Sequence, residues 1–356
     1  MRLLVAIPTY KNFSSGYTIA KTLNGLVQQN IKDFRLLIVY KTYPLDKTLD
    51  IIDNYKDRLE IEITKQKDGY VEEAMNLIFN ISRDYDIVLT LDDDTIPCNT
   101  WIDEHIYLHK CFNRVGLITG LLEPFVNVHR KNQIIEKIYN IWGYYKPLYS
   151  EFKYYLTYIN DMGLSVDFNP LIVRPYDRHI DNLREILEQS IFTLSAGAIG
   201  ANMSFKGKTV ENFTLPGATL RGIGYEQVFV THLIRQGFQS AIANCCRVKH
   251  LERKSLSRME DIYGDFAIGL ETYVQPYSIN IYEKINTKKL KLFNQILRLY
   301  AKWRHTIYSE AVFKGLTIAI KAIEEEWKPN TVRDAIYQVF GEFKTLNTIV
   351  NRESKE

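Results

Sequence analysis

The sequence predicts an α/β fold with a mostly parallel central sheet flanked by helices, and three observations lead to this class. Short apolar segments alternate with segments of helical periodicity over residues 3–111. The fourth apolar segment, Ile87–Leu91, is uninterrupted and leads into three consecutive aspartates. Beyond residue 255 the pattern is helical to the last residue. Because parallel neighbouring strands need helical crossovers, repeated strand–helix units indicate a parallel sheet with a helical addition.

The first part of the chain divides into four strand–helix units. The expected strands are Leu3–Ile7, Leu36–Tyr40, Leu59–Thr64 and Ile87–Leu91. The expected helices cover Gly16–Gln28, the segment from Asp46 to Tyr55, Val71–Phe79, and a segment that begins near Trp101, after a break at Pro97. Apolar residues recur in these helices at the spacing of one helical face.

The acidic triplet Asp92-Asp93-Asp94 directly follows the most apolar strand. A continuous run of apolar or β-branched residues is typical of a strand in the middle of a parallel sheet, and open α/β sheets bind ligands at the carboxyl ends of their strands. Three adjacent carboxylates repel one another unless a cation lies among them, which favours a divalent metal site. The alternative is a solvated turn, with Asn99 or Thr100 capping the next helix.

Composition limits the classes of partner. Of the 356 residues, 46% are hydrophobic and 24% are charged, and the net charge of +3 gives no reason to expect nucleic acid binding. The four cysteines, at positions 98, 111, 245 and 246, show no Cys-x-x-Cys spacing. This argues against a zinc site or a disulfide framework, and we expect a cytoplasmic protein.

Membrane contact, if any, is expected to be peripheral. The N-terminal apolar run stops at Pro8 and indicates a strand rather than a signal peptide, and no apolar stretch reaches the ~18 residues of a membrane span. Lys284–His305 combines basic and apolar residues in helical spacing. Such a helix can contact an anionic inner membrane surface, mediate homo-oligomerisation, or simply cover the core.

Two later regions differ from the first four units. Residues 123–190 form an insertion rich in aromatic side chains, which either bind an acceptor or pack as the core of a helical subdomain. The strand pattern returns at Ile191–Ser195, followed by small residues that allow close backbone approach. A helix is expected from Tyr225 to Gln236, with Gly237 as its stop, and final strands over Phe238–Ala243 and Arg247–His250.

Taken in order, these motifs resemble those of the inverting family-2 glycosyltransferases of the GT-A fold, with a Rossmann-like nucleotide-binding half. The likeness covers about residues 1–254 without the insertion. It is carried by the motifs Ile7-Pro8-Thr9-Tyr10, Leu91-Asp92-Asp93-Asp94 with its Asp-x-Asp pattern, Gly200–Phe205, and Gly224-Tyr225-Glu226. The resemblance implies a nucleotide-sugar-binding half (1–122) and an acceptor and catalytic half (191–254), and the sequence pattern adds the insertion (123–190) and a helical region (255–356).

The resemblance also implies a role for each matching residue. Glu226 matches the catalytic base, and the metal ligands for Mn²⁺ or Mg²⁺ would be Asp92, Asp94 and His250. The nucleotide sugar would contact Pro8, Thr9, Tyr10, Asp68, Asp92, Asp93, Arg253 and Lys254. The acceptor side would include Gly200, Ala201, Asn202 and Tyr225. The expected reaction moves a sugar from a nucleotide-diphosphate donor to a hydroxyl of a protein, lipid or glycan.

Departures from the family pattern leave other functions open. The acid that usually follows the second strand is absent, since that strand runs into Tyr40-Lys41-Thr42-Tyr43, and Glu226 replaces the usual Asp. A non-catalytic sugar-nucleotide or glycan-binding protein would fit these changes. A nucleotidyltransferase of similar fold is a further alternative, although Pro8-Thr9-Tyr10-Lys11-Asn12 lacks a glycine-rich phosphate loop.

Overall fold

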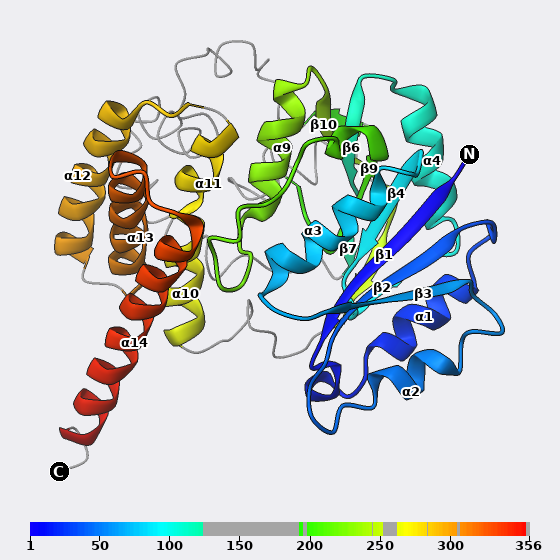
Figure 1. Ribbon diagram of the computed structural model, residues 1–356, viewed down its shortest axis with the longest axis horizontal. Helices are drawn as coiled ribbons and strands as arrows, with labels where there is room; N and C mark the ends of the chain where they lie inside the picture. Colours follow the sequence, from blue (N-terminus) through cyan, green and yellow to red (C-terminus); the bar gives the residue numbers. More distant parts are fainter. Residues whose placement is uncertain are drawn as a thin grey trace.

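The computed structural model describes residues 1–123, 192–194, 198–243, 245–251, 262–282, 284–304 and 307–353. A central sheet carries helices on both faces, and a further layer of helices lies on the far side of one of these faces (Figure 1). The aromatic insertion, apart from Glu123, and the predicted nucleotide contacts Arg253 and Lys254 lie outside the described residues.

Among the described residues, the main sheet has eight strands in the order β3-β2-β1-β4-β9-β6-β10-β8. Their bounds are β1 Leu3–Tyr10, β2 Arg35–Lys41, β3 Ile61–Gln66, β4 Ile87–Leu91, β6 Val115–Thr119, β8 Phe192–Leu194, β9 Asn202–Lys206 and β10 Gln239–Ala243. β9 runs antiparallel to β4 and β6, and β8 runs antiparallel to β10. The other neighbours are parallel, so the predicted fold class is confirmed.

A small second sheet, β5-β11-β7, was not predicted from the sequence. Its strands are β5 Thr95–Pro97, β7 Leu122–Glu123 and β11 Val248–His250. We expected only a break at Pro97, but Pro97 is the last residue of β5 and pairs with Val248. Since β5 begins one residue after the acidic triplet, this pairing carries His250 to Thr95, beside the end of β4.

Helices cover both faces of the main sheet (Figure 1). Strand side chains point alternately to the two faces; in β1, Leu4 and Ala6 join the cluster with α3 and α9, while Val5 and Ile7 pack with α1, α2 and α4. The helices are η1 Asn12–Ser15, α1 Ile19–Val27, α2 Thr48–Asp53, α3 Val71–Ser82, α4 Trp101–Cys111, η3 Gly207–Val210 and α9 Tyr225–Arg235.

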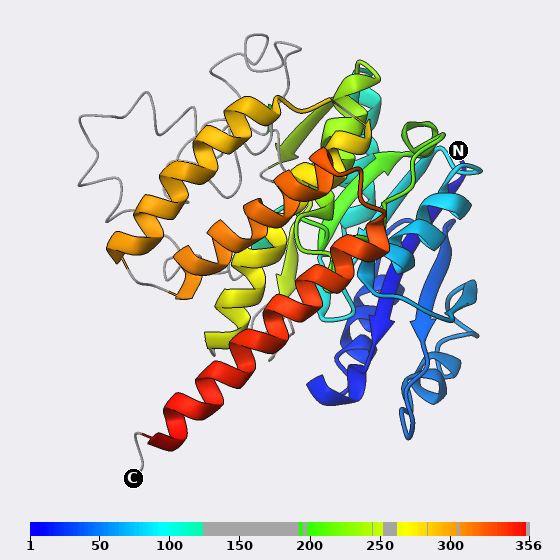
Figure 2. The same cartoon turned by 60° about the vertical axis from the view of Figure 1, so that its left-hand side comes forward.

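The C-terminal helices continue the core of the sheet domain. They are α10 Ile262–Thr272, α11 Gln275–Tyr282, α12 Thr287–Arg304, α13 Ile307–Glu324 and α14 Pro329–Glu353. In Figure 2 the yellow to red helices lie side by side. Both α10 and α14 contact α13, and they also contact each other. Buried Phe266 and Leu270 of α10 belong to the same apolar cluster as Phe79 of α3. Within the described part of the chain, every helix is too short or too polar to cross a membrane.

Candidate active site

The acidic triplet lies where the most buried strand of the sheet ends. All five residues of β4 are buried, and the chain turns directly after Leu91. Asp93 is 3% exposed and its Oδ2 accepts a hydrogen bond of 2.6 Å from the hydroxyl of Thr9, at the end of the neighbouring β1. Asp94 is 1% exposed. The triplet is therefore held inside the protein at the sheet edge, which contradicts the alternative of a solvated turn.

Asp92, Asp94 and His250 form a group that can hold a cation. One ligand atom of each lies within 4.8 Å of the others. Nε2 of His250 is 3.5 Å from Oδ1 of Asp94, and both side chains are almost fully buried. The backbone N–H of Leu251 donates to the carbonyl of Asp94 at 2.8 Å, which fixes the end of β11 against the triplet. Two carboxylates and one imidazole make a donor set that suits Mn²⁺, so the chemistry of the residues fits the expected metal.

The predicted base, Glu226, lies in the first turn of α9. The helix begins after Gly224, whose φ of 86° is a left-handed conformation that glycine adopts without strain. Oε1 of Glu226 accepts a hydrogen bond of 3.1 Å from the backbone N–H of Gly200. The side chain keeps some accessible surface, but the surrounding protein raises its pKa to about 7 because burial disfavours the carboxylate.

Gly200 connects this glutamate to the strand of the acidic triplet. The hydroxyl of Thr90, two residues before Asp92, donates to the carbonyl of Gly200 at 3.2 Å. On its other side, the N–H of Gly200 donates to Glu226. A Cβ at position 200 would lie 2.1 Å from the Tyr225 hydroxyl oxygen and 2.9 Å from Oε1 of Glu226, so any larger residue there would displace these two side chains. The strand of the acidic triplet and the candidate base are thus both hydrogen-bonded to the backbone of Gly200.

The predicted acceptor-side residues are less accessible than the motif suggested. Asn202 is fully buried: its Oδ1 accepts from the Trp101 indole N–H at 2.8 Å, and its Nδ2 donates to the carbonyls of Leu121 and Cys246. Ala201 and Tyr225 are 8% and 7% exposed. Asn202 therefore positions the surrounding segments and has no amide group left to contact an acceptor.

Two buried acids fix the segment that leads into α9. Glu72 at the start of α3 accepts backbone hydrogen bonds from Gly217, Ala218 and Thr219, at 2.7 to 3.2 Å. Glu271 of α10 accepts the N–H of Arg221 at 2.8 Å and forms an ion pair with its guanidinium at 3.3 Å. Burial raises the pKa of Glu72, and it raises that of Glu271 to about 7. These contacts hold the segment before α9 against α3 and against the C-terminal helix α10.

The ends of β1 and β2 carry aromatic and basic side chains, of which only Tyr10 was expected from the sequence to contact the nucleotide. Tyr10 is 38% exposed and lies edge-on to Tyr43 at a centroid distance of 6.2 Å. The Lys11 ammonium lies 4.4 Å from the Tyr43 ring centre, and that of Lys41 lies 5.1 Å from Tyr10. Phe13 stacks on Tyr43 at 5.3 Å. The segment Tyr40-Lys41-Thr42-Tyr43 already contained these aromatic and basic residues, but in the sequence it was noted only as a departure from the family pattern.

The remaining predicted nucleotide contacts lie at the same edge of the sheet. Pro8 is half-buried near the end of β1, and Thr9 uses its hydroxyl to hold Asp93. Asp68 is exposed after β3, and its carbonyl accepts a hydrogen bond of 3.0 Å from Gln66. Lys41 of β2 donates to the carbonyl of Gly69 next to it. The carboxyl ends of β1, β2, β3 and β4 thus bring the described nucleotide-side residues together, as expected for an open α/β sheet.

Structural comparison shows similarity to solved proteins at low sequence identity. Mannosyltransferase PcManGT from Pyrobaculum calidifontis, in complex with GDP-Man and Mn²⁺, has a TM-score of 0.48 at 12% identity, covering 97% of this chain and 87% of that one. S. aureus TarS 1–349 has a TM-score of 0.46 at 11% identity, with 92% of each chain covered. A longer S. aureus TarS structure has a TM-score of 0.45 at 12% identity, with 83% of this chain covered. The present chain spans 42% of that longer TarS chain.

Sequence comparison finds a family match for the first part of the chain. No match to the sequence was found among curated proteins. Residues 4–168 match the family model described as glycosyl transferase family 2, which includes β1 to β7 and the acidic triplet. This match agrees with the predicted family resemblance and supports the predicted enzyme class. Residues 4–168, a little under half of the chain, are therefore similar to glycosyl transferase family 2.

Proposed function

We propose that this chain is a metal-dependent, inverting glycosyltransferase that moves a sugar from a nucleotide-diphosphate donor to an acceptor hydroxyl, with Glu226 as general base. The observation that carries the proposal is the link through Gly200. It joins the strand that ends in Asp92 and Asp94 to the first turn of α9, where Glu226 lies. The proposed reaction needs the donor at the acids and the base beside the acceptor hydroxyl, and this link keeps the acids and Glu226 in one part of the protein.

The proposed base has the properties that the reaction requires. A carboxylate with a pKa of about 7 is partly ionised at neutral pH, and its conjugate acid is weak enough to make it an effective proton acceptor. Glu226 would take the acceptor proton as the hydroxyl oxygen attacks the anomeric carbon from the face opposite the leaving diphosphate. Such a single displacement inverts the configuration at that carbon. The Gly200 N–H keeps the carboxylate oriented before and after proton transfer.

The metal ligands in this proposal are Asp92, Asp94 and His250. A divalent cation bound there would offset the negative charge that builds on the leaving diphosphate. The imidazole of His250 favours Mn²⁺ over Mg²⁺, because Mg²⁺ prefers oxygen ligands in a stricter octahedral arrangement. Asp93 has a different role, because through Thr9 it ties the end of β4 to the end of β1.

We also propose that the rings of Tyr10 and Tyr43 receive the nucleobase. Tyr10 is the last residue of β1, which pairs with the strand of the acidic triplet, and Tyr43 follows β2, the next strand of the sheet. Tyr10 is exposed and Tyr43 is half-buried, and aromatic faces stack on bases of every kind. Lys11 and Lys41, close to these rings, add positive charge that suits the donor diphosphate. An aromatic contact in place of the usual acid explains how the site could hold a nucleotide without that acid.

The direct test is donor hydrolysis. The protein is incubated with Mn²⁺ and a panel of nucleotide sugars that includes UDP-GlcNAc and GDP-Man, and released nucleoside diphosphate is measured. Release from at least one donor, lost in Asp94→Asn, supports the proposal. Donor binding without release would instead favour the non-catalytic sugar-nucleotide or glycan-binding protein. Release of pyrophosphate from a nucleoside triphosphate and a sugar phosphate would favour the nucleotidyltransferase.

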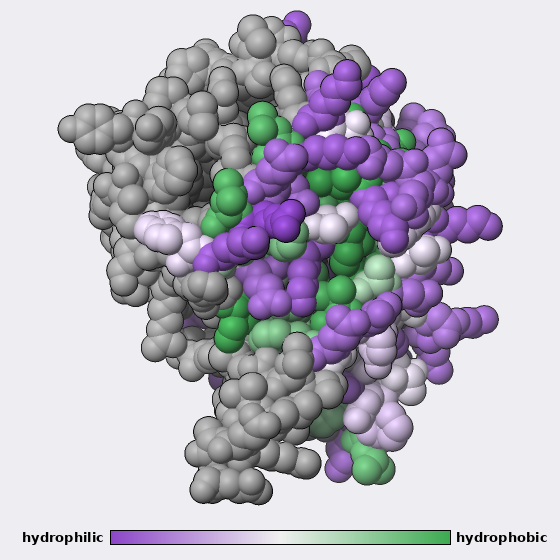
Figure 3. All heavy atoms as spheres, turned by 90° about the vertical axis from the view of Figure 1, so that its left-hand side faces the viewer, coloured by the Kyte–Doolittle hydropathy of each residue, from purple (hydrophilic) through white to green (hydrophobic). Residues whose placement is uncertain are grey.

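One face of α12 exposes apolar side chains beside basic ones, and this bears on the acceptor and on the location of the protein. Leu292, Leu299 and Trp303 are 56%, 68% and 55% exposed at spacings of seven and four residues, hence on one helical face. The helix contains no acid, and exposed Lys288, Arg298 and Lys302 accompany these residues. Figure 3 views this side of the molecule and shows hydrophobic side chains within a mainly hydrophilic surface. We propose that this face rests on an anionic membrane, at the cytoplasmic side, where a lipid acceptor or a lipid-linked glycan would be within reach.

A further inference from the structure

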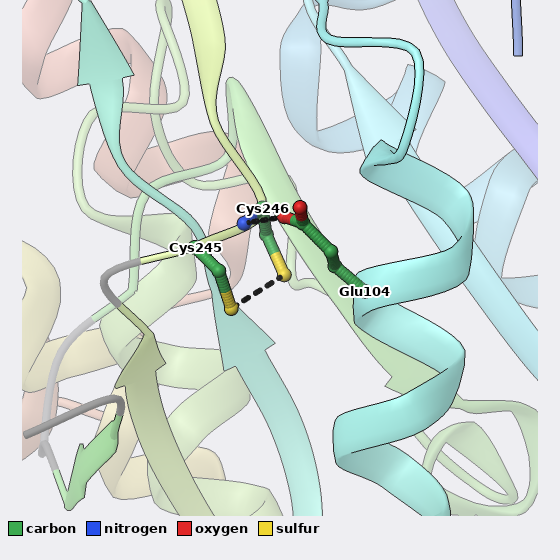
Figure 4. Close-up of side chains that lie close together, drawn as sticks. All are labelled: Glu104, Cys245 and Cys246. Atoms are coloured by element: carbon green, nitrogen blue, oxygen red, sulfur yellow. Dashed lines mark hydrogen bonds between the residues drawn. The ribbon is translucent and has the colours of Figure 1, made fainter.

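Glu104, Cys245 and Cys246 come together although they are distant in the sequence. Glu104 lies in the first turn of α4, and the two cysteines precede β11. Figure 4 shows both thiols pointing to the same side, with the carboxylate of Glu104 turned toward Cys246. One ligand atom of each residue lies within 4.8 Å of the other two. None of these residues belongs to the donor or acceptor site described above.

The backbone around Cys246 is fixed at both of its polar groups. Its N–H donates to Oε2 of Glu104, and its carbonyl accepts a hydrogen bond of 2.7 Å from the Asn202 amide. Cys246 has a φ of 56°, a conformation that residues with a side chain rarely adopt. Gly120 leaves the necessary room, since a Cβ there would lie 2.0 Å from the Cys246 carbonyl oxygen. The two thiols are thus presented in one arrangement without a bound ligand.

The distance between the thiols matches the edge of a zinc tetrahedron. The two Sγ atoms are 3.7 Å apart, well beyond the length of a disulfide bond. Two thiolates at about 2.3 Å from a tetrahedral ion are about 3.8 Å apart. A carboxylate oxygen is an accepted third ligand of Zn²⁺, at about 2.0 to 2.2 Å. The observed separation therefore needs little change to accommodate the ion.

The charges of the group also favour a cation. Cys246 is fully buried and Cys245 is half-buried, and burial raises the pKa of the Cys246 thiol. The hydrogen bond between the two thiols lowers the pKa of Cys245, while Glu104 opposes ionisation of both thiols electrostatically. Three neighbouring groups that can each become negative repel one another unless a positive ion offsets their charge. Soft thiolate ligands select zinc over magnesium or manganese.

We propose that Glu104, Cys245 and Cys246 bind a thiophilic divalent cation, Zn²⁺ in the cell, at a structural site separate from Asp92, Asp94 and His250. Binding would release the thiol protons to solvent and join the start of α4 to the segment that enters β11. The absence of Cys-x-x-Cys spacing argued against a zinc site in the sequence, because there the third ligand stands 141 positions before Cys245. The fourth position of the ion is open to water or to Cys98, whose thiol is close enough to raise the pKa of Cys246.

The test uses the full chain, reduced with a phosphine and freed of metal by chelation. Cd²⁺ alone is titrated in as a spectroscopic substitute for Zn²⁺, and the absorption of cadmium–thiolate bonds is recorded. We expect a band that saturates at one ion per chain and is displaced by Zn²⁺. Cys245→Ser should remove most of this band, and Glu104→Gln should weaken Cd²⁺ binding by at least about tenfold. Zn²⁺ should also raise the unfolding temperature of the unaltered protein more than that of Cys245→Ser.

Matched controls separate this site from other thiols and from the proposed active site. Cys111 is an exposed cysteine outside the group, so Cys111→Ser should keep the band. Asp94→Asn should also keep it, because carboxylate and imidazole ligands give no thiolate absorption. Circular dichroism verifies that each variant is folded; Cys245 is chosen because it is less buried than Cys246. A missing band in the unaltered protein, or a band that survives Cys245→Ser but not Cys111→Ser, would overturn the assignment.

Discussion

The pKa of Glu226 leads to a pH dependence that can be calculated. With a pKa of about 7, the carboxylate is ionised to about 9% at pH 6, about half at pH 7 and about 91% at pH 8. If the carboxylate is the base, kcat at saturating donor, acceptor and Mn²⁺ should rise about tenfold from pH 6 to pH 8. An ordinary exposed glutamate, ionised throughout this range, would give a flat profile. The profile is measured by release of the nucleoside diphosphate.

Removing the carboxylate should abolish most of the activity and also the rise of kcat between pH 6 and pH 8. Glu226→Gln keeps the size of the side chain, and we expect kcat to fall by about 10² to 10⁴, with donor affinity within about twofold of the unaltered protein. Glu226→Asp is the matched control, because it restores a carboxylate that is shorter by one methylene; it should recover part of the activity. Donor affinity is measured by calorimetry in the presence of Mn²⁺.

Protein stability gives an independent measure of the same pKa. Since the folded-state pKa lies above the ordinary value of 4.5, the folded protein binds more protons than the unfolded chain between about pH 4.5 and 7. The contribution of Glu226 to the free energy of unfolding therefore decreases as pH rises through this window. Denaturant unfolding of Glu226→Gln should lack this part of the pH dependence. A flat kcat profile together with unchanged activity of Glu226→Gln would refute the assignment of the base.

Four further predictions test the rest of the site. Asp94→Asn should abolish both Mn²⁺ binding and transfer, as seen by paramagnetic relaxation and product release; full activity without Mn²⁺ would show that the acids do not hold a metal. His250→Asp should shift the preferred ion from Mn²⁺ toward Mg²⁺, which is visible in the ratio of the two metal-dependent rates. Tyr43→Ala should raise the donor KM by about tenfold, which is about 1.4 kcal/mol and lies within the ~1–3 kcal/mol of a lost base stack, with kcat nearly unchanged; an equal loss in kcat would place Tyr43 elsewhere. Leu299→Glu should reduce sedimentation with anionic vesicles without affecting activity on a soluble acceptor, and a shift in the oligomeric state instead would make this face a contact between copies of the chain.

The sequence was sufficient for the elements that rely on local pattern. Ile87–Leu91 was predicted with its observed bounds, since a run of five apolar or β-branched residues between polar residues is typical of a buried strand. The start of α9 at Tyr225 followed from Gly224, and its stop from Gly237, which has a φ of 83°. The nearness of Asp92, Asp94 and His250 was predicted from a family resemblance, not from spacing, and the structure brings these residues together.

The local sequence pattern could not predict which distant segments pair with each other. Thr95–Pro97 reads as a turn because a three-residue strand has no periodicity, and its partner β11 lies more than 150 residues later in the sequence. Asn202 was expected to contact the acceptor because its segment resembles the acceptor-side motif of the family, but the structure buries it against Trp101 and Cys246. The role of a polar side chain depends on the partners that tertiary packing supplies, and sequence spacing does not contain them.

The shared core of the sheet domain and the C-terminal helices limits how the protein can be shortened. A chain ending at residue 254 would lose Phe266 and Leu270 from the apolar cluster of α3 and α9. Arg221, which precedes α9, would lose its ion-pair partner Glu271. It would also lose Arg333, which reaches back from α14 to Glu73 and the carbonyl of Thr219. Expression trials should therefore retain the chain to at least residue 343, where the last described core phenylalanine lies.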